Sequence, residues 1–139
     1  VNESFSLTSK NNNNTFKYLK NPGWSICDNS SSSPSIDLLI YVHSTPSNLK
    51  NRLLIRETWA KRGLFPQTRL VFMLGSTQNK TIQHKIELES QIYNDIVQQN
   101  FDDSYRNLTL KCIMSLEWVS NYCTSAKYVL KTDDDVIVR

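Results

Sequence analysis

Apolar residues in this chain are concentrated in four short runs, and longer segments with helical spacing separate them. Each run is rich in β-branched and large aliphatic residues, which is typical of strands covered on both faces of a parallel sheet. The four predicted strands are residues 36–42, 69–74, 95–98 together with Phe101, and 127–132. A last apolar run, 136–138, is also strand-like.

Three helices are expected between the strands. Asn48 is suited to cap a helix that continues to Lys61, and residues 81–93 predict a second helix, most clearly in its second half. Asp103 or Ser104 could cap a third helix, in which apolar residues form one stripe at helical spacing. The members of that stripe are Leu108, Cys112, Leu116, Val119 and Cys123. The alternation of strands and helices predicts an α/β fold with a parallel, doubly wound sheet.

Residues 1–35 differ in composition from the rest of the chain. They consist mostly of Asn, Ser, Lys and Thr, and they offer too little apolar surface to offset the entropy of ordering. We expect a flexible, stem-like leader, in which Phe16, Tyr18 and Trp24 are the residues able to dock locally. Residues 36–139 are long enough to form one domain with its own core.

Charge and motifs narrow the class of function. The net charge is +3 with acidic and basic residues interspersed, so the chain has no nucleic-acid-binding footprint. It also has no Gly-X-Ser-X-Gly elbow, no Walker phosphate loop, no Gly-X-Gly-X-X-Gly fingerprint and no zinc-ligand spacing. No run of about 18 apolar residues occurs, so no membrane span is predicted within the chain.

Cysteines and glycosylation sequons favour the lumen of the secretory pathway over the cytosol. Cys27, Cys112 and Cys123 are an odd number of thiols, and their pairing cannot be deduced from spacing. Asn-X-Ser/Thr sequons are candidate N-glycosylation sites. They occur at Asn2, Asn13, Asn29, Asn79 and Asn107.

Polar residues follow each of the four predicted strands. Because the carboxyl ends of parallel strands meet at one edge of the sheet, ligands of such folds bind beside these ends. The expected edge carries small, hydroxylated or acidic residues at 43–45, 75–77, 102–104 and 133–135. We therefore expect a ligand site at this edge.

Asp133, Asp134 and Asp135 are the strongest chemical signal in the chain. Carboxylates beside a β-branched strand are costly unless water or a cation compensates their charge. Hard divalent cations such as Mg²⁺ and Mn²⁺ prefer carboxylate oxygens and often bind together with substrate phosphates. The triplet therefore indicates either a metal site or an acidic turn that faces water.

Arg52 and Arg56 are four positions apart, so they lie on one face of the first predicted helix. Two cations there could neutralise a diphosphate at the sheet edge, and the alternative is a solvated charged face. Ile55 and Trp59 are expected to pack against the sheet. His43 lies at the same edge, but nothing in the sequence gives it a partner that would indicate catalysis.

Three segments of the sequence, in this order along the chain, resemble the motifs of a known family. Residues 52–59 read Arg-Leu-Leu-Ile-Arg-Glu-Thr-Trp, and residues 101–111 read Phe-Asp-Asp-Ser-Tyr-Arg-Asn-Leu-Thr-Leu-Lys. Residues 126–136 close with Lys-Thr-Asp-Asp-Asp-Val. These blocks resemble the signatures of the β1,3-galactosyltransferase family, which also includes β1,3-N-acetylglucosaminyltransferases. The resemblance covers about Ile36 to Arg139.

This resemblance implies a GT-A fold, of which residues 36–139 would be the N-terminal, UDP-sugar-binding part, truncated at its C-terminus. It implies a type II membrane glycoprotein of the Golgi, with the catalytic domain in the lumen and a membrane anchor upstream of Val1. The donor would be a UDP-sugar held through Mn²⁺ at an Asp-X-Asp motif. The acceptor would be a glycan on a glycoprotein or glycolipid.

Roles carried over from the family fall on the acid triplet first. Asp135 is the first choice for direct metal coordination, and Asp133 is expected nearer the ribose or donor sugar, with a share in the metal site. Asp134 accompanies them in the nucleotide-sugar site. Further family positions expected near the nucleotide are Arg52, Arg56, Asp103 and Lys111.

The implied activity is that of an inverting hexosyltransferase that moves galactose from UDP-galactose in β1,3 linkage. The general base is expected beyond Arg139, so we expect this chain alone to be inactive. Three alternatives stay open. They are N-acetylglucosamine transfer from UDP-GlcNAc, a fragment that binds UDP and metal without catalysis, and a glycosylated interaction protein whose triplet binds Ca²⁺ or no ion.

Overall fold

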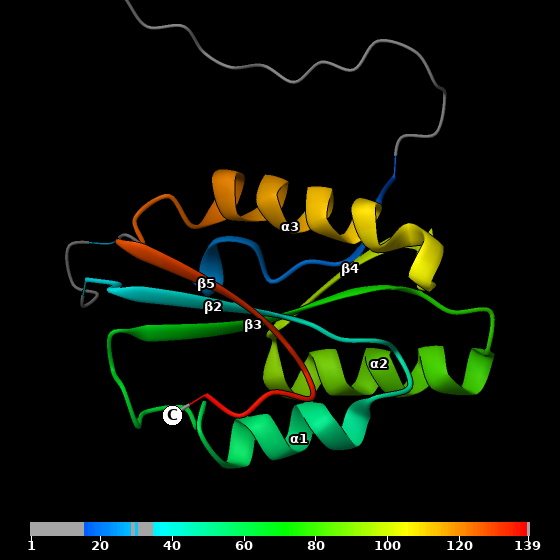
Figure 1. Ribbon diagram of the computed structural model, residues 1–139, viewed down its shortest axis with the longest axis horizontal. Coiled ribbons are helices and arrows are strands. Elements are labelled where there is room, and N and C mark those ends of the chain that lie inside the picture. Colours follow the sequence, from blue (N-terminus) through cyan, green and yellow to red (C-terminus); the bar gives the residue numbers. More distant parts are fainter. Residues whose placement is uncertain (1–15, 29, 31–34, 139) are drawn as a thin grey trace, which may run out of the picture.

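The computed structural model describes residues 16–28, 30 and 35–138. From residue 36 on, its elements follow the predicted alternation (Figure 1). The strands are β1 (Tyr18–Lys20), β2 (Leu38–His43), β3 (Thr68–Ser76), β4 (Ile96–Asp102) and β5 (Tyr128–Asp133). The helices are α1 (Leu49–Glu57), α2 (Lys80–Tyr93) and α3 (Leu108–Tyr122), with short 3₁₀ helices η1 (Gly23–Ser25) and η2 (Tyr105–Asn107).

Four strands form a parallel sheet in the order β4–β3–β2–β5, and β1 pairs antiparallel with the outer side of β4. The chain starts this sheet at β2, builds outward to β4, and then returns to the other side of β2 with β5. Such a reversal is a topological switch point, where the loops after two adjacent strands diverge and leave a crevice. The topology confirms the predicted parallel, doubly wound α/β sheet, and it is consistent with a Rossmann-like GT-A half domain.

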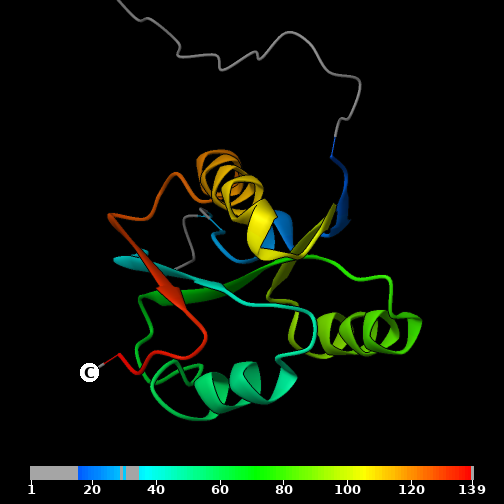
Figure 2. The same ribbon diagram turned by 45° about the vertical axis from the view of Figure 1, so that its right-hand side comes forward.

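Two apolar cores lie on opposite faces of the sheet, because successive strand residues point to opposite sides. Helix α3 covers one face, and α1 and α2 cover the other (Figures 1 and 2). The core under α3 includes Leu39, Val71, Met73, Val97, Met114 and Trp118. The core under α1 and α2 includes Ile40, Val42, Ile55, Phe72, Leu74 and Ile86.

Part of the predicted leader is structured. Strand β1 pairs with β4, and Cys27 forms a disulfide with Cys123 just after α3. The expected docking of Phe16, Tyr18 and Trp24 is confirmed, since each contacts side chains of the folded domain. Residues 16–28 are therefore not flexible as a whole, because long-range partners order a segment whose composition alone would leave it unfolded. Residues 1–15 and 31–34 lie outside the described residues.

The buried face of α3 differs from the predicted apolar stripe. Leu108, Cys112 and Leu116 are exposed, although Cys123 is buried. The residues of α3 that are buried are Lys111, Met114, Ser115 and Trp118. The stripe prediction holds only at its end, at Val119 and Cys123. It fails earlier in the helix because Lys111 and Ser115 find buried polar partners from distant segments, which the spacing of apolar residues cannot reveal.

The segment after β5 also differs from its prediction. Residues 136–138 follow a turn and are not part of a strand. Val136 and Ile137 are exposed. Across the described parts of the chain, no helix combines the length and apolar character needed to cross a membrane.

Candidate functional site

The carboxyl ends of β2 and β5 lie side by side at the switch point. His43 and Asp133 are register partners in these two strands, so the acid triplet begins beside the loop that follows β2. Asp134 Oδ2 accepts hydrogen bonds from Ser44 Oγ at 2.6 Å and from Asn48 Nδ2 at 2.9 Å. The acid turn therefore rests against the β2–α1 loop.

The other two carboxylates of the triplet are exposed. Asp133 Oδ1 accepts a hydrogen bond from Lys131 Nζ at 2.7 Å, whereas Asp135 has no hydrogen bond or ion pair with the described residues. Within the described ranges, no three His, Cys, Asp or Glu side chains converge closely enough to hold a metal ion alone. Asp133 and Asp135 nevertheless fit a hard divalent cation, because such ions often use one or two carboxylates and complete their shell with phosphate oxygens and water.

Arg52 lies on the face of α1 that it shares with Arg56, as predicted, but its side chain is buried and not solvated. Its Nε and Nη2 donate to the Glu89 carboxylate of α2, each at 2.8 Å. The remaining N–H groups donate to Ser44 Oγ and to two carbonyl oxygens of the β2–α1 loop. All five guanidinium donors therefore have internal partners.

Arg56 belongs to the same buried charge cluster. It donates to Glu89 at 2.8 Å and to the two oxygens of Asp95 at 2.9 and 2.7 Å, and its guanidinium lies 4.1 Å from the centre of the Tyr93 ring. Burial disfavours the charge, but the hydrogen bonds and charges of Asp95 and Glu89 outweigh it and raise the pKa of Arg56. In this arrangement neither Arg52 nor Arg56 is the free rim cation that we expected. Their contact with a nucleotide stays a prediction.

Asp103 and Lys111 form a buried ion pair between the ends of the strands. Lys111 Nζ donates to Asp103 Oδ1 at 2.7 Å and to the Ser44 carbonyl at 2.6 Å, and Asp103 Oδ2 accepts from the Gly75 N–H at 2.6 Å. A Cβ on Gly75 would lie 2.9 Å from the Phe101 carbonyl oxygen, so the close approach requires glycine. The pair ties together the loops after β2, β3 and β4. Its predicted contact with a nucleotide is likewise untested.

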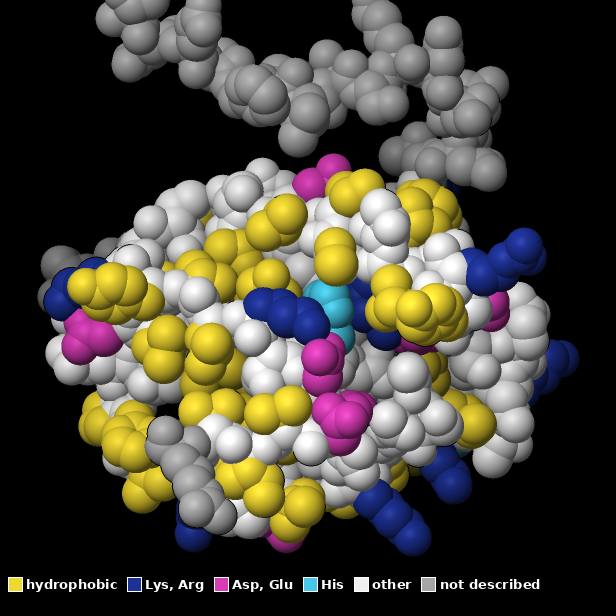
Figure 3. Space-filling view, viewed as in Figure 1, with side chains coloured by type: hydrophobic (Ala, Val, Ile, Leu, Met, Phe, Trp, Pro, Cys, Tyr) yellow, Lys and Arg dark blue, Asp and Glu magenta, His cyan; other side chains and the backbone are white. Residues whose placement is uncertain are grey.

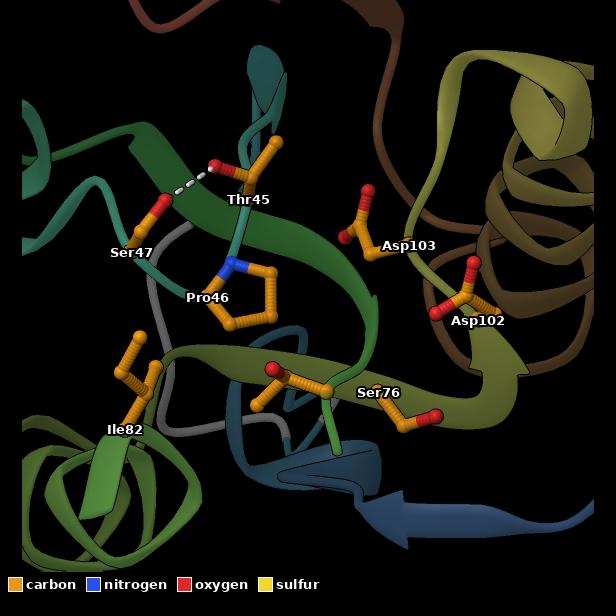
Figure 4. A pocket seen from close by; sticks show the side chains of 8 residues that line it. Thr45, Pro46, Ser47, Ser76, Ile82, Asp102 and Asp103 are labelled. Atoms are coloured by element: carbon orange, nitrogen blue, oxygen red, sulfur yellow. Dashed lines mark hydrogen bonds between the residues drawn. The ribbon is translucent and has the colours of Figure 1, made fainter. Parts of the chain in front are cut away.

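A polar pocket of about 300 Å³ opens between these loops (Figure 4). On one side of the pocket, Thr45 Oγ1 and Ser47 Oγ are 3.2 Å apart and hydrogen-bond to each other. The pocket is lined by Thr45, Pro46, Ser47, Ser76, Thr77, Ile82, Asp102 and Asp103. The predicted meeting of polar strand ends at one edge is confirmed.

His43 is buried beside the acid turn. Ser115 Oγ donates to the Lys111 carbonyl at 2.7 Å, so the His43 Nε2–H is the donor in the 3.0 Å bond to Ser115 Oγ. Burial, helped by the positive charges of Lys131 and Lys111 and opposed by Asp133, lowers the pKa of His43 to about 4. The imidazole is therefore neutral near pH 7. In the face that Figure 3 shows, the histidine that can be seen lies next to both basic and acidic side chains.

Two of the five sequons fall within the described residues. Asn79 is exposed at the N-cap of α2, where its Oδ1 accepts from the Ile82 N–H at 3.1 Å. Asn107 Nδ2 donates to the Asp102 carbonyl at 2.8 Å. Glycosylation at either asparagine stays a prediction. The remaining sequons lie outside the described residues, at Asn2, Asn13 and Asn29.

The sequence did not identify the acidic partners of Arg52 and Arg56, nor the hydrogen bond from the Asn48 amide to Asp134. An arginine pair on one helix face signals that carboxylates are needed nearby, but it does not identify Glu89 or Asp95. Asn48 does occupy the N-cap of α1, as predicted, yet its side chain makes no cap hydrogen bond and is directed to Asp134 instead.

Known proteins with similar sequences belong to one family. Residues 50–139, more than half of the chain, match the family profile described as Galactosyltransferase. The chain belongs to the galactosyltransferase family. Human beta-1,3-galactosyltransferase 1 is 41% identical over 103 residues, which are 73% of this chain and 32% of that protein. Mouse beta-1,3-galactosyltransferase 4 is 44% identical over 111 residues, 77% of this chain and 29% of that protein.

The part of the chain that matches the galactosyltransferase profile includes Arg52 and Arg56, the Asp103–Lys111 pair and the acid triplet. The resemblance inferred from the three sequence blocks is therefore confirmed at the level of the family. The chain spans about a quarter to a third of the length of the curated relatives it matches, with 25% of mouse beta-1,3-galactosyltransferase 2 covered at 40% identity.

Proposed function

We propose that this chain is the UDP-sugar-binding part of an inverting β1,3-galactosyltransferase that transfers galactose from UDP-galactose to a glycan. The observation that carries the proposal is the position of the acid turn. Asp133 is the last residue of β5, and Asp134 and Asp135 follow it at the topological switch point, beside the loop after β2. A nucleotide is expected there in an open α/β sheet.

The donor diphosphate needs a counter-charge, and Mn²⁺ is the proposed one. Asp135 would hold the ion, with Asp133 shared between the ion and the ribose or donor sugar. When bound, the ion supplies electrostatic stabilisation of the charge that develops on the departing UDP. Asp133 has one carboxylate oxygen not used by Lys131, and Asp135 has two without a partner among the described residues, so both are available.

The other family positions would act mainly by shaping the site. Arg52 and Arg56 neutralise Glu89 and Asp95, and this holds the β2–α1 loop on α2. Lys111 and Asp103 fix the loops around the polar pocket. A rigid rim contributes to catalysis by holding the donor in one orientation.

Other parts of the proposal concern the whole protein. The carboxylate that deprotonates the acceptor hydroxyl would come from a segment beyond Arg139, as would most of the acceptor site. The parent protein would be a Golgi membrane glycoprotein, anchored upstream of Val1, with this domain in the lumen. The family relationship and the similarity to beta-1,3-galactosyltransferases support these proposals.

Transfer assays on the full-length protein test the proposed function. We expect galactose transfer from UDP-galactose in the presence of Mn²⁺, with a β1,3 linkage in the product. Asp135→Asn should reduce the rate at least about 100-fold. The matched control Asp37→Asn should not, because Asp37 pairs with Lys127 just before β2, at the opposite end of that strand.

The choice of donor is decided in the same assay. Transfer from UDP-GlcNAc but not from UDP-galactose would replace the galactosyl assignment with N-acetylglucosaminyl transfer. Absence of transfer from both donors across a panel of glycan acceptors would contradict the transferase proposal.

A further inference from the structure

The three adjacent carboxylates differ in how they are attached to the rest of the protein. Asp133 contacts Lys131 of its own strand, and Asp135 is exposed. Asp134 is half-buried, and both of its hydrogen bonds come from the β2–α1 loop and the start of α1. These bonds cross the switch point between β2 and β5.

We propose that Asp134 is a positioning residue that fastens the acid turn to the β2–α1 loop, and that Ser44 and Asn48 are the groups it acts through. The assignment rests on the proposed function in one respect, since it makes Asp133 and Asp135 the carboxylates presented to the nucleotide and its cation. It also replaces the expectation that Asp134 contacts the nucleotide-sugar.

Ser44 is itself fixed by buried charges. Its hydroxyl accepts a hydrogen bond from Arg52 Nη1 at 3.0 Å, and its carbonyl accepts one from Lys111 Nζ at 2.6 Å. A hydroxyl has one proton, and the Ser44 proton is directed to Asp134 at 2.6 Å. The acid turn is therefore connected through one side chain to two buried ion pairs.

Asn48 gives an independent indication of the same role. An asparagine at an N-cap usually accepts a hydrogen bond from an N–H of its own helix. Asn48 makes no such bond, and its amide donates to Asp134 at 2.9 Å. The Asn48 side chain therefore stabilises the acid turn and not the start of its own helix.

Hydrogen exchange in the full-length protein, without nucleotide or metal, tests the attachment directly. In the double variant Ser44→Ala/Asn48→Ala, the amides at the end of β5 and the Val136 amide, which is hydrogen-bonded within the turn, should exchange about 10-fold faster, because hydrogen bonds to a carboxylate are among the stronger ones. Ser44→Thr keeps the hydroxyl and should exchange within about 2-fold of wild type. Ser47→Ala removes a hydroxyl of the same loop that does not contact Asp134, and it should leave the turn unchanged. Unchanged exchange in the double variant would overturn the proposal.

A double-mutant cycle on UDP affinity, measured by calorimetry with Mn²⁺, separates positioning from direct contact. The double variant Ser44→Ala/Asn48→Ala and the variant Asp134→Asn should each weaken UDP binding about 10-fold, and the triple variant should lose no more than about 10-fold. A loss of about 100-fold in the triple variant, or a loss in Asp134→Asn that Ser44→Ala/Asn48→Ala does not share, would mean that Asp134 contacts the ligand itself. If the wild-type protein does not bind UDP, the proposed function fails, and the exchange measurement still decides the role of Asp134.

Discussion

At the scale of single residues, identical side chains in one short turn acquire different properties from their neighbours. The same holds for His43, which looks like an ordinary polar rim residue in the sequence. In the folded chain it is enclosed between α3 and the acid turn, with Ser115 as its hydrogen-bond partner. Because enclosure favours the neutral ring, His43 links the stability of the rim to pH.

The free energy of unfolding should decrease as the pH is lowered from 6.5 to about 4. The pKa of His43 is lowered to about 4, so in this window the unfolded chain takes up a proton that the folded chain does not. The free energy of unfolding therefore decreases as the pH falls, by about 3 kcal/mol at most. Urea unfolding at several pH values, without added metal, measures this slope.

Two histidine variants make the assignment specific. His43→Gln keeps a donor for Ser115 but does not titrate, so its slope should be flatter than that of wild type. His84→Gln changes an exposed histidine and should keep the wild-type slope. Equal slopes in His43→Gln and wild type would show that another group is responsible.

At the scale of elements, the strands could be predicted because their signal is local. An apolar, β-branched run bounded by polar turns needs no knowledge of its partners, and β2 to β5 lie where such runs were found. The orientation of α3 could not be predicted in this way. Its buried Lys111 is compatible with the core only because Asp103 and the Ser44 carbonyl accept hydrogen bonds from its ammonium group.

The charge cluster between α1 and α2 leads to a prediction at this scale. Arg52→Ala would leave Glu89 buried with only Arg56 as a partner and would free the carbonyls of the β2–α1 loop. We expect a loss of about 3–5 kcal/mol in the free energy of unfolding, measured by chemical denaturation. Arg62→Ala, at an exposed position just beyond α1, should change it by less than about 0.5 kcal/mol. A small loss in Arg52→Ala would mean that the cluster is not structural.

At the scale of the whole molecule, one disulfide and one edge strand order an N-terminal segment that its composition alone would leave unfolded. The disulfide between Cys27 and Cys123 joins residues 96 positions apart, and β1 extends the sheet beyond β4. Neither feature has a local signature, since three cysteines allow several pairings and a three-residue strand carries little pattern. The order of the strands, by contrast, follows from general rules of chain connection.

Removal of the disulfide should be costly, and removal of the third thiol should not. Closing a loop of this length restricts the unfolded chain, so Cys27→Ser should lower the free energy of unfolding by about 2–4 kcal/mol. Cys112 is exposed and unpaired within the described residues, and Cys112→Ser should change stability by less than about 0.5 kcal/mol. A non-reducing peptide map that joins Cys112 to either of the other two would contradict this pairing.

We propose that the carboxyl ends of β2 and β5 form a cation-dependent site for uridine diphosphate. Calorimetric titration of UDP into the full-length protein, with and without Mn²⁺, tests it most directly. We expect that UDP binds with Mn²⁺, that its affinity falls at least about 100-fold without the ion, and that Asp135→Asn has the same effect while Asp37→Asn has none. UDP binding that is independent of both Mn²⁺ and Asp135, or divalent-cation binding that UDP does not influence, would rule out this site.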